Sequence, residues 1–237
     1  DANTSLVDNN NITNTSYGIL VGDSMSPVKV SEELNITNNL FTMSTQYDVY
    51  VYGNYTDLLI EDNQFHNATA SGIGVVSDLG AGIINNNTLH NHSVGIYIQS
   101  PDYTVTQNTI TKSSSIAIEI RSESNIVVEN NTITQSGTGI RLYMTTNVTV
   151  ENNTITGNSL AGVNTSYVNV TTIKNNNLSS NGYGVYLEHS ARTGYSQNYV
   201  YQNSLHSNTV LDAYSDRRIT FNYTTKGNYW GASSCPY

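Results

Sequence analysis

Charged side chains recur at one fixed place in three similar segments, residues 126–133, 148–155 and 171–178. In each segment the charged residue directly precedes a pair of asparagines, and these residues are Glu129, Glu151 and Lys174. If the segments stack, the two carboxylates lie on neighbouring strands and could perform acid–base chemistry on a sugar, one of them with a raised pKa. The alternative is a surface ladder of charges in which Lys174 offsets its neighbours. We favour the ladder and keep the three residues as the candidate catalytic group.

Other chemical motifs are sparse. His90 and His92 lie on one side of a predicted strand, as two metal ligands would, but no third ligand is evident. Met25, Met43 and Met144 are too scattered to suggest copper binding. Serine-hydrolase, phosphate-loop and dinucleotide motifs are absent from the sequence. We therefore expect no cofactor and no metal site.

The asparagine pairs belong to a repeat that covers most of the chain. The second asparagine of each pair serves as an anchor, and consecutive anchors lie 21 to 24 residues apart. A second mark, Gly-apolar-x-apolar, recurs between anchors, as at 139–142 and 184–187. In the strand carrying this mark, the outward position reads Tyr97, Glu119 and Arg141 on consecutive repeats. The anchors are Asn39, Asn63, Asn87, Asn108, Asn131, Asn153, Asn176 and Asn198.

Each repeat is too short to bury its own apolar face, so stacking of the repeats is required. The sequence therefore predicts an all-β, single-stranded parallel β-helix of about ten coils of roughly 22–23 residues, with neighbouring coils about 4.8 Å apart. We expect the anchor asparagines to hydrogen-bond along the stack as a ladder. The predicted organisation is one domain, 1–237, with an irregular N-terminal coil or cap over 1–33, regular coils over 34–203, and an irregular last coil with an aromatic cap over 204–237.

The Asn-Asn-Thr-Ile and Gly-Ile-x-Leu copies, together with the closing sequence Gly-Asn-Tyr-Trp-Gly at 227–231, resemble the right-handed parallel β-helix repeat family. That family includes NosD-like domains and carbohydrate-binding and sugar-hydrolase domains. The resemblance implies right-handed coils, but it leaves the activity open. The Asn- and Thr-rich chain is also similar to archaeal cell-surface proteins, including the sheath or S-layer proteins of methanogens.

Composition excludes several classes of function. Charged residues make up only 11% of the chain, and the net charge of −9 disfavours a nucleic-acid groove. No apolar run is long enough to span a membrane. Hydrophobic residues still make up 37% of the chain, which is enough to build a core.

An extracellular or cell-surface location is expected, since the chain starts without a leader, as a mature secreted protein would. It also carries many Asn-x-Ser/Thr sequons, and these predict N-glycosylation. Glycans at Asn130 and Asn152 would crowd each other, so we expect that both are not fully occupied. The candidate sites are Asn3, Asn11, Asn14, Asn35, Asn54, Asn67, Asn86, Asn91, Asn130, Asn147, Asn152, Asn164, Asn169, Asn177 and Asn222.

The single cysteine, Cys235, lies close to the C-terminus and is a candidate for an intermolecular disulfide. A chain that is nearly all solenoid, with dispersed charge, favours a structural protein of the cell envelope that is not an enzyme. Its partner would be itself, in a homopolymer joined through the solenoid edges and through Cys235. The alternative is an extracellular β-helix that binds or cleaves a polysaccharide, as a lyase, hydrolase or epimerase, with Glu129, Glu151 and Lys174 as its candidate site.

Overall fold

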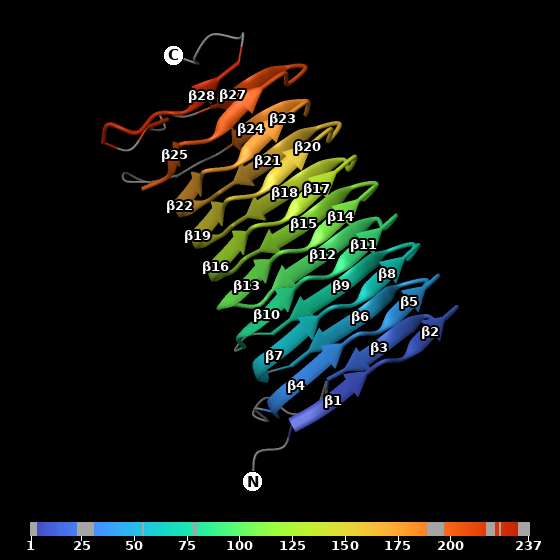
Figure 1. Ribbon diagram of the computed structural model, residues 1–237. Coiled ribbons are helices and arrows are strands. Elements are labelled where there is room, and N and C mark those ends of the chain that lie inside the picture. Colours follow the sequence, from blue (N-terminus) through green and yellow to red (C-terminus); the bar gives the residue numbers. More distant parts are fainter. Residues whose placement is uncertain are drawn as a thin grey trace.

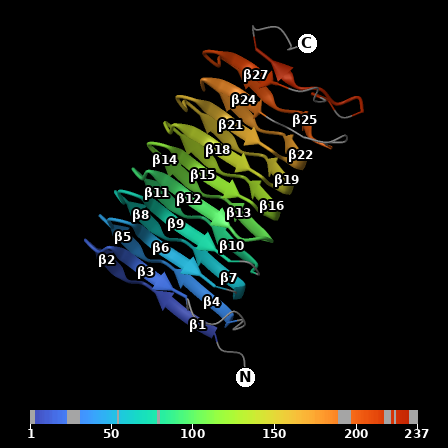
Figure 2. The same cartoon turned by 180° about the vertical axis from the view of Figure 1, so that it is seen from behind.

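The computed structural model describes residues 4–22, 31–53, 55–77, 80–188, 197–216, 221–222 and 224–231, and within them it is a right-handed parallel β-solenoid without helices. Figure 1 shows the coils stacked into an elongated body with the two termini at opposite ends. Seen from behind, the strands again run side by side, each beside its copy in the next coil (Figure 2). The predicted fold class is confirmed.

Each complete coil contributes one strand to each of three parallel sheets, which we call A, B and C. Sheet A contains β1 (Thr4–Asp8), β4 (Ser31–Thr37), β7 (Tyr55–Glu61), β10 (Gly82–Asn85), β13 (Tyr103–Thr106), β16 (Ser124–Glu129), β19 (Thr146–Glu151), β22 (Asn169–Lys174) and β25 (Tyr199–Tyr201). Sheet B contains β2 (Asn11–Thr13), β5 (Leu40–Thr42), β8 (Gln64–His66), β11 (Thr88–His90), β14 (Thr109–Thr111), β17 (Thr132–Thr134), β20 (Thr154–Thr156), β23 (Asn177–Ser179), β26 (Ser204–His206) and β28 (Tyr229–Trp230). Sheet C contains β3 (Tyr17–Val21), β6 (Tyr47–Tyr52), β9 (Ser71–Val76), β12 (Val94–Gln99), β15 (Ile116–Arg121), β18 (Thr138–Tyr143), β21 (Ala161–Ser166), β24 (Tyr183–Glu188) and β27 (Leu211–Ser215).

The corner between sheets A and B explains why asparagine recurs there. The residue before each anchor adopts the left-handed conformation, with φ of 55° at both Asn38 and Asn130 and 56° at Asn152. Asparagine tolerates this conformation better than most residues, since its short polar side chain hydrogen-bonds locally. The first asparagine of each pair therefore makes the turn, and the second occupies the interior.

The interior is filled by columns of mainly aliphatic side chains that run along the stack. The middle residue of each short strand of sheet B points inward, and the rings of Phe41 and Phe65 stack there with centroids 4.9 Å apart. Inward positions of sheet C continue the same packing, with Ile118 and Ile140 in register and fully buried. Because the core is continuous along the axis, each coil is stabilised by its two neighbours.

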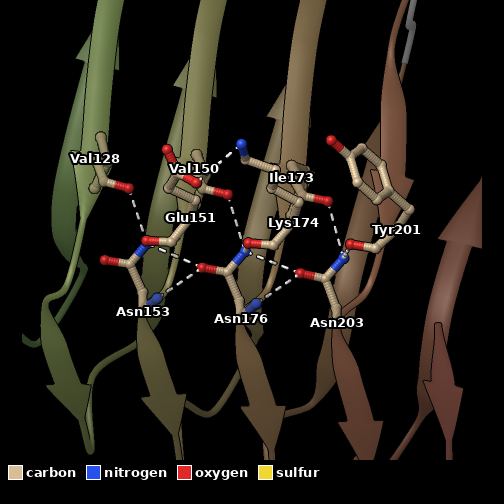
Figure 3. A network of polar contacts seen from close by, with 9 residues as sticks. All are labelled: Val128, Val150, Glu151, Asn153, Ile173, Lys174, Asn176, Tyr201 and Asn203. Atoms are coloured by element: carbon tan, nitrogen blue, oxygen red, sulfur yellow. Dashed lines mark hydrogen bonds and ion pairs between the residues drawn. The ribbon is translucent and has the colours of Figure 1, made fainter. Parts of the chain in front are cut away.

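The anchor asparagines are buried and hydrogen-bonded along the stack, as Figure 3 shows for the C-terminal part of the ladder. The Asn153 side-chain amide donates to Asn176 Oδ1 at 3.0 Å and to the Val128 carbonyl at 2.9 Å. The next member is Asn203, whose Oδ1 accepts from Asn176 Nδ2 at 2.9 Å. Prediction of Asn198 as the next anchor was wrong. Asn198 instead accepts from the Thr171 backbone N–H, so it lies at an earlier position in its coil.

A second polar ladder, which the sequence analysis did not identify, runs five residues beyond the anchors. The backbone N–H of Ser113 donates to Ser136 Oγ, and that of Ser136 donates to Asn158 Oδ1. The side-chain amide of Asn158 then donates to Asn181 Oδ1, and the backbone N–H of Asn181 donates to Asn208 Oδ1. Between Ser113 and Asn208, a second corner of the coils is therefore also held by side-chain amides or hydroxyls.

Strand pairing continues towards both ends of the described chain. Residues 4–21 form three strands that pair in register with the following coil, inside the segment 1–33 for which an irregular coil or cap was predicted. Near the C-terminus, β26, β27 and β28 extend sheets B and C. Cys235 lies outside the described residues. In the described part of the chain, no helical segment has the length and hydropathy of a membrane span.

Candidate functional site

Charged side chains cluster on the outer face of sheet C, on strands in the middle of that sheet. Glu119 on β15 and Arg141 on β18 are register partners one strand apart, as the sequence analysis expected. Their nearest charged atoms, Arg141 Nη1 and Glu119 Oε1, are 3.6 Å apart. The Glu119 side chain is only 11% exposed, whereas that of Arg141 is 41% exposed. The pair therefore has a shielded anion and a cation that solvent or a ligand can reach.

A second arginine adds positive charge beside this pair. Arg121 lies two residues after Glu119 on the same strand, and its guanidinium carbon is 5.2 Å from the ring centroid of Tyr143. The guanidinium of Arg141 is 5.6 Å from the same ring. Such distances allow cation–π attraction, which fixes flexible side chains in place. These two are the only arginines among the described residues, and they converge on one ring in a protein of net charge −9.

The sequence analysis did not single out Arg121 and Tyr143, although a signal was present. Side chains two residues apart on a strand point to the same face. Position 121 follows Glu119, and position 143 follows Arg141, by that interval. Reading two outward columns per strand, rather than one, would have revealed the whole cluster.

Tyr97 on β12 completes the centre on the other side of Glu119, since the two residues are register partners. Its hydroxyl donates to Gln99 Oε1 at 2.7 Å. Burial raises the pKa of Tyr97, whereas the nearby Arg121 guanidinium acts in the opposite direction. The phenol thus carries its proton at neutral pH, next to a carboxylate and an arginine. The centre is defined as Tyr97, Glu119, Arg121, Arg141 and Tyr143.

The three candidate residues from the sequence lie on a different face, the outer side of sheet A. Glu129, Glu151 and Lys174 are in register on β16, β19 and β22. Lys174 Nζ lies 3.0 Å from Glu151 Oε2, and that hydrogen bond raises the pKa of Lys174. Tyr201 on β25 is the next register partner. Glu129, Glu151 and Lys174 thus lie together, and the carboxylate of Glu151 is paired with the ammonium group of Lys174.

The histidines occupy two separate environments. His92 is buried, and its Nε2 is 2.9 Å from Oδ2 of the equally buried Asp48 two coils away. His66 and His90 lie outside the core on sheet B with ring centroids 6.3 Å apart, and His90 Nδ1 is 2.8 Å from Thr111 Oγ1. Within the described residues, no group of three or more His, Cys, Asp or Glu side chains could hold a metal ion.

Most predicted glycosylation sites lie at coil corners or strand edges. Asn3 and Asn54 fall outside the described residues, and Asn35, Asn164 and Asn177 are partly buried. Asn130 and Asn152 are both exposed at the same corner of consecutive coils, where their crowding was expected. The remaining exposed sites are Asn11, Asn14, Asn67, Asn86, Asn91, Asn147, Asn169 and Asn222.

A family model described as right handed beta helix region matches residues 74–228, which is more than half of the chain. The chain belongs to the right-handed β-helix family. Residues 1–126 of this β-helix protein also match the model described as periplasmic copper-binding protein (NosD). No curated protein matches the sequence.

The residues that the structure describes do not fit a copper site. Of the buried His92–Asp48 pair, His92 Nε2 is already engaged, and the described residues supply no third ligand. The scattered methionines also do not converge, because Met43 and Met144 are exposed on different coils and Met25 lies outside the described residues.

Solved structures share the architecture over nearly the whole chain. A mutant of the periplasmic alginate epimerase AlgG aligns with TM-score 0.64 and 15% identity, over 96% of this chain and 50% of that one. The enzymatically active domain of bacteriophage CBA120 tailspike protein 2 aligns with TM-score 0.57 and 9% identity, over 97% and 42%. The A-module of the Azotobacter vinelandii mannuronan C-5 epimerase AlgE4 aligns with TM-score 0.53 and 14% identity, over 86% and 65%. The chain thus spans about half the length of AlgG.

These identities establish a shared fold, and the activities belong to the proteins named. They nevertheless correct one prediction. Two of the three structures are epimerases of alginate or mannuronan, and the third is an enzymatically active domain. They contradict the prediction of a self-assembling structural envelope protein that is not an enzyme, and the alternative of a polysaccharide-active β-helix is taken up below as a proposal.

Proposed function

We propose that this β-helix protein binds an acidic polysaccharide on the outer face of sheet C and acts on it at the centre. The observation that carries the proposal is the convergence of Arg121 and Arg141 on Tyr143, next to the shielded carboxylate of Glu119. Guanidinium groups bind carboxylates in a bidentate geometry, and tyrosine rings pack against the apolar faces of sugars. A uronate residue presents both features to such a surface.

The strands of sheet C that the structure describes offer no pair of carboxyl groups for glycoside hydrolysis, so the reaction we propose is proton abstraction next to a carboxylate. Hydrolysis requires a pair of carboxyl groups flanking the bond. Among the described strands of sheet C, the outer face carries two acidic side chains, Glu119 and Glu188, and three strand spacings separate β15 from β24. With about 4.8 Å per spacing, the two backbones are about 14 Å apart, which exceeds the separation of either glycosidase class.

In the proposed reaction the arginines hold the uronate carboxylate and offset the negative charge that develops on it. Glu119 accepts the proton from the carbon next to that carboxylate. Donation of the Tyr97 phenolic proton to the opposite face of this carbon gives the epimer, after which Glu119 releases its proton to solvent and the Tyr97 phenolate takes one up. Alternatively, the adjacent bond to the glycosidic oxygen breaks and its electron pair leaves with that oxygen. Tyr97 then donates a proton to the oxygen, and a carbon–carbon double bond remains in the sugar.

An envelope or extracellular location is part of the proposal. Its support is the periplasmic description of the NosD family model and of AlgG, together with the exposed sequons. Acidic polysaccharides are found in that compartment, where a polar, acidic β-helix would meet them. N-glycosylation at the exposed sequons is the accompanying prediction, and Asn130 and Asn152 are expected to compete.

The test is incubation of the purified protein with polyuronates. Proton NMR in D₂O detects epimerisation and exchange at the carbon next to the carboxylate, and ultraviolet absorbance detects the unsaturated product of elimination. We expect Glu119→Gln to abolish turnover and Arg141→Gln to weaken binding. Glu151→Gln and Lys174→Met on sheet A are the matched controls, since they break an ion pair on the other face.

Sheet A remains the second candidate, because Glu129 and Glu151 are adjacent carboxylates with Lys174 beside them. Loss of activity in Glu151→Gln, with full activity in Glu119→Gln, would move the site to sheet A. Unchanged polyuronate binding in both Arg141→Gln and Arg121→Gln would refute the assignment to sheet C.

A further inference from the structure

Tyrosines form a cluster on the outer face of sheet C on the N-terminal side of the centre. The rings of Tyr17 and Tyr47 stack with centroids 6.0 Å apart, and Tyr47 and Tyr50 lie 4.5 Å apart. Tyr52 stacks on Tyr50 at 6.4 Å. These four residues, which we call the first platform, come from neighbouring strands β3 and β6.

Glycine at position 74 makes room for this platform. A Cβ placed there would be 2.5 Å from a ring carbon of Tyr47 and 2.9 Å from one of Tyr50. The two rings therefore fill the space above β9, on the side that leads to Tyr97 of the centre. Burial raises the pKa values of both Tyr47 and Tyr50, so their hydroxyls stay protonated at neutral pH.

A second group of tyrosines lies on the C-terminal side of the centre. Tyr183 and Tyr186 on β24 are 4.9 Å apart edge to face, and Tyr186 stacks on Tyr214 of β27 at 4.9 Å with an interplanar angle of 16°. Tyr214 is 37% exposed. We call these three residues the second platform. Tyr199 and Tyr201, which are close to this group in the sequence, lie on sheet A.

The platforms and the centre lie in one line along the stack. Sheet C orders its strands β6-β9-β12-β15-β18-β21-β24, so the first platform, the centre and the second platform follow one another on one sheet. Six strand spacings of about 4.8 Å separate β6 from β24, which gives about 29 Å. Figure 2 shows that this direction is the long axis of the molecule, across the strands.

Packing of the core does not account for these rings. The inward positions of the same strands are already filled by aliphatic side chains such as Val49 and Val185. Tyrosines lie on both sides of Glu119 and Arg141, and the outward column between the two platforms reads Gly74, Tyr97, Glu119, Arg141 and Asn164. A linear ligand that crosses the centre would meet an aromatic surface on each side.

We propose that sheet C takes an extended polymer, running along the solenoid axis, with one sugar on each platform and the reacting uronate at the centre. This inference rests on the proposed function and adds a length requirement to it. The substrate class is a long linear polyuronate attacked at internal positions, since a short oligosaccharide reaches the centre without either platform.

The experiment compares a diuronate with a hexauronate by isothermal titration calorimetry. We expect the hexauronate to bind at least about tenfold more tightly, because it gains a ring contact at each end. Tyr186→Ala should weaken hexauronate binding by about three- to tenfold and leave diuronate binding unchanged. Gly74→Ala should act in the same way without removing a tyrosine, because its Cβ displaces the rings of Tyr47 and Tyr50. Tyr201→Ala on sheet A is the matched control and should change neither affinity.

The outcomes separate the two proposals. The proposal that the platforms bind sugars would be overturned, with the centre unaffected, by either of two results. One is an equal affinity of the protein for the two ligands, and the other is an equal loss of affinity for diuronate and hexauronate in Tyr186→Ala and Gly74→Ala. Absence of binding by either ligand would overturn the proposed function, and the platforms with it. Melting temperatures of the variants, measured alongside, identify any loss that is due to unfolding.

Discussion

Replacing Asn153 with alanine should destabilise the solenoid far more than an ordinary surface change. Asn153 Oδ1 accepts from the backbone N–H and from the side-chain amide of Asn131, at 2.9 and 3.0 Å. Asn153 Nδ2 donates to the carbonyls of Val128 and Glu151 and to Asn176 Oδ1. All of this lies at a position that is 1% exposed, so bulk water does not replace the lost bonds.

The magnitude follows from the groups left without partners. Alanine strips the acceptor from the buried N–H of Asn131 and the side-chain donor from the carbonyl of Val128. The carbonyl of Glu151 keeps the N–H of Asn130 at 3.2 Å. Each buried polar group left without a hydrogen-bond partner costs about 1–3 kcal/mol, so the two groups together should lower the free energy of unfolding by about 2–6 kcal/mol. Asn164→Ala, on the outer face of sheet C, should change it by less than about 0.5 kcal/mol.

Urea titration followed by circular dichroism gives the free energies. Because solenoid coils unfold partly independently, hydrogen–deuterium exchange at the amide of Asn131 is the sharper readout. We expect faster exchange at that amide and its neighbouring coils, while distant coils near the N-terminus keep their protection. A loss below about 0.5 kcal/mol in Asn153→Ala, equal to that in Asn164→Ala, would refute the reasoning that the ladder stabilises the fold.

Three further predictions concern other parts of the solenoid. Gly139→Ala should cost about 1–3 kcal/mol or more by chemical denaturation, because its Cβ would lie 2.5 Å from the Gly162 carbonyl oxygen; wild-type stability would contradict that close packing. Lys174→Met should change stability by no more than about 1 kcal/mol, since its ion pair with Glu151 is solvent-accessible; a larger loss in a denaturant titration would mean that the charges on sheet A are structural. Burial lowers the pKa of His66 in the folded state. The unfolded chain therefore binds the proton more readily, and the stability of the protein should fall as the pH drops below about 6.5. Melting curves of His66→Gln should depend less on acid pH than those of the wild type, and an unchanged dependence would exclude His66 as a contributor.

Most of the fold could be predicted because the repeat encodes it redundantly. Each coil supplies a corner asparagine, an anchor and alternating apolar residues, so a single weak copy does not hide the pattern. The failure at Asn198 shows the limit. Asn198 lies 22 residues after Asn176 and fits the mean period, whereas the true ladder residue, Asn203, lies 27 residues after it. Spacing alone does not reveal which coil carries an insertion, and hydrogen-bond register does.

The candidate site could be predicted only in part. One outward column gave the neighbourhood of Glu119 and Arg141, because register in a parallel stack follows directly from the period. The sequence does not give the direction of long side chains, so the convergence of Arg121 and Arg141 on Tyr143 remained hidden. The expectation of a structural role came from low, dispersed charge, an average over the chain that does not register a local cluster.

By itself the sequence determined the solenoid, the parallel stacking of its repeats and the asparagine ladder as far as Asn176. These depend on local periodicity, and the period of each repeat fixes which residues become neighbours in the next coil. Only the tertiary structure decided which of the three outer faces carries the cluster of candidate functional side chains. Arginines and tyrosines far apart in the chain meet on sheet C because coils bring residues about 22 positions apart to within one strand spacing of about 4.8 Å. The room that Gly74 leaves for two rings exists only once those coils are stacked.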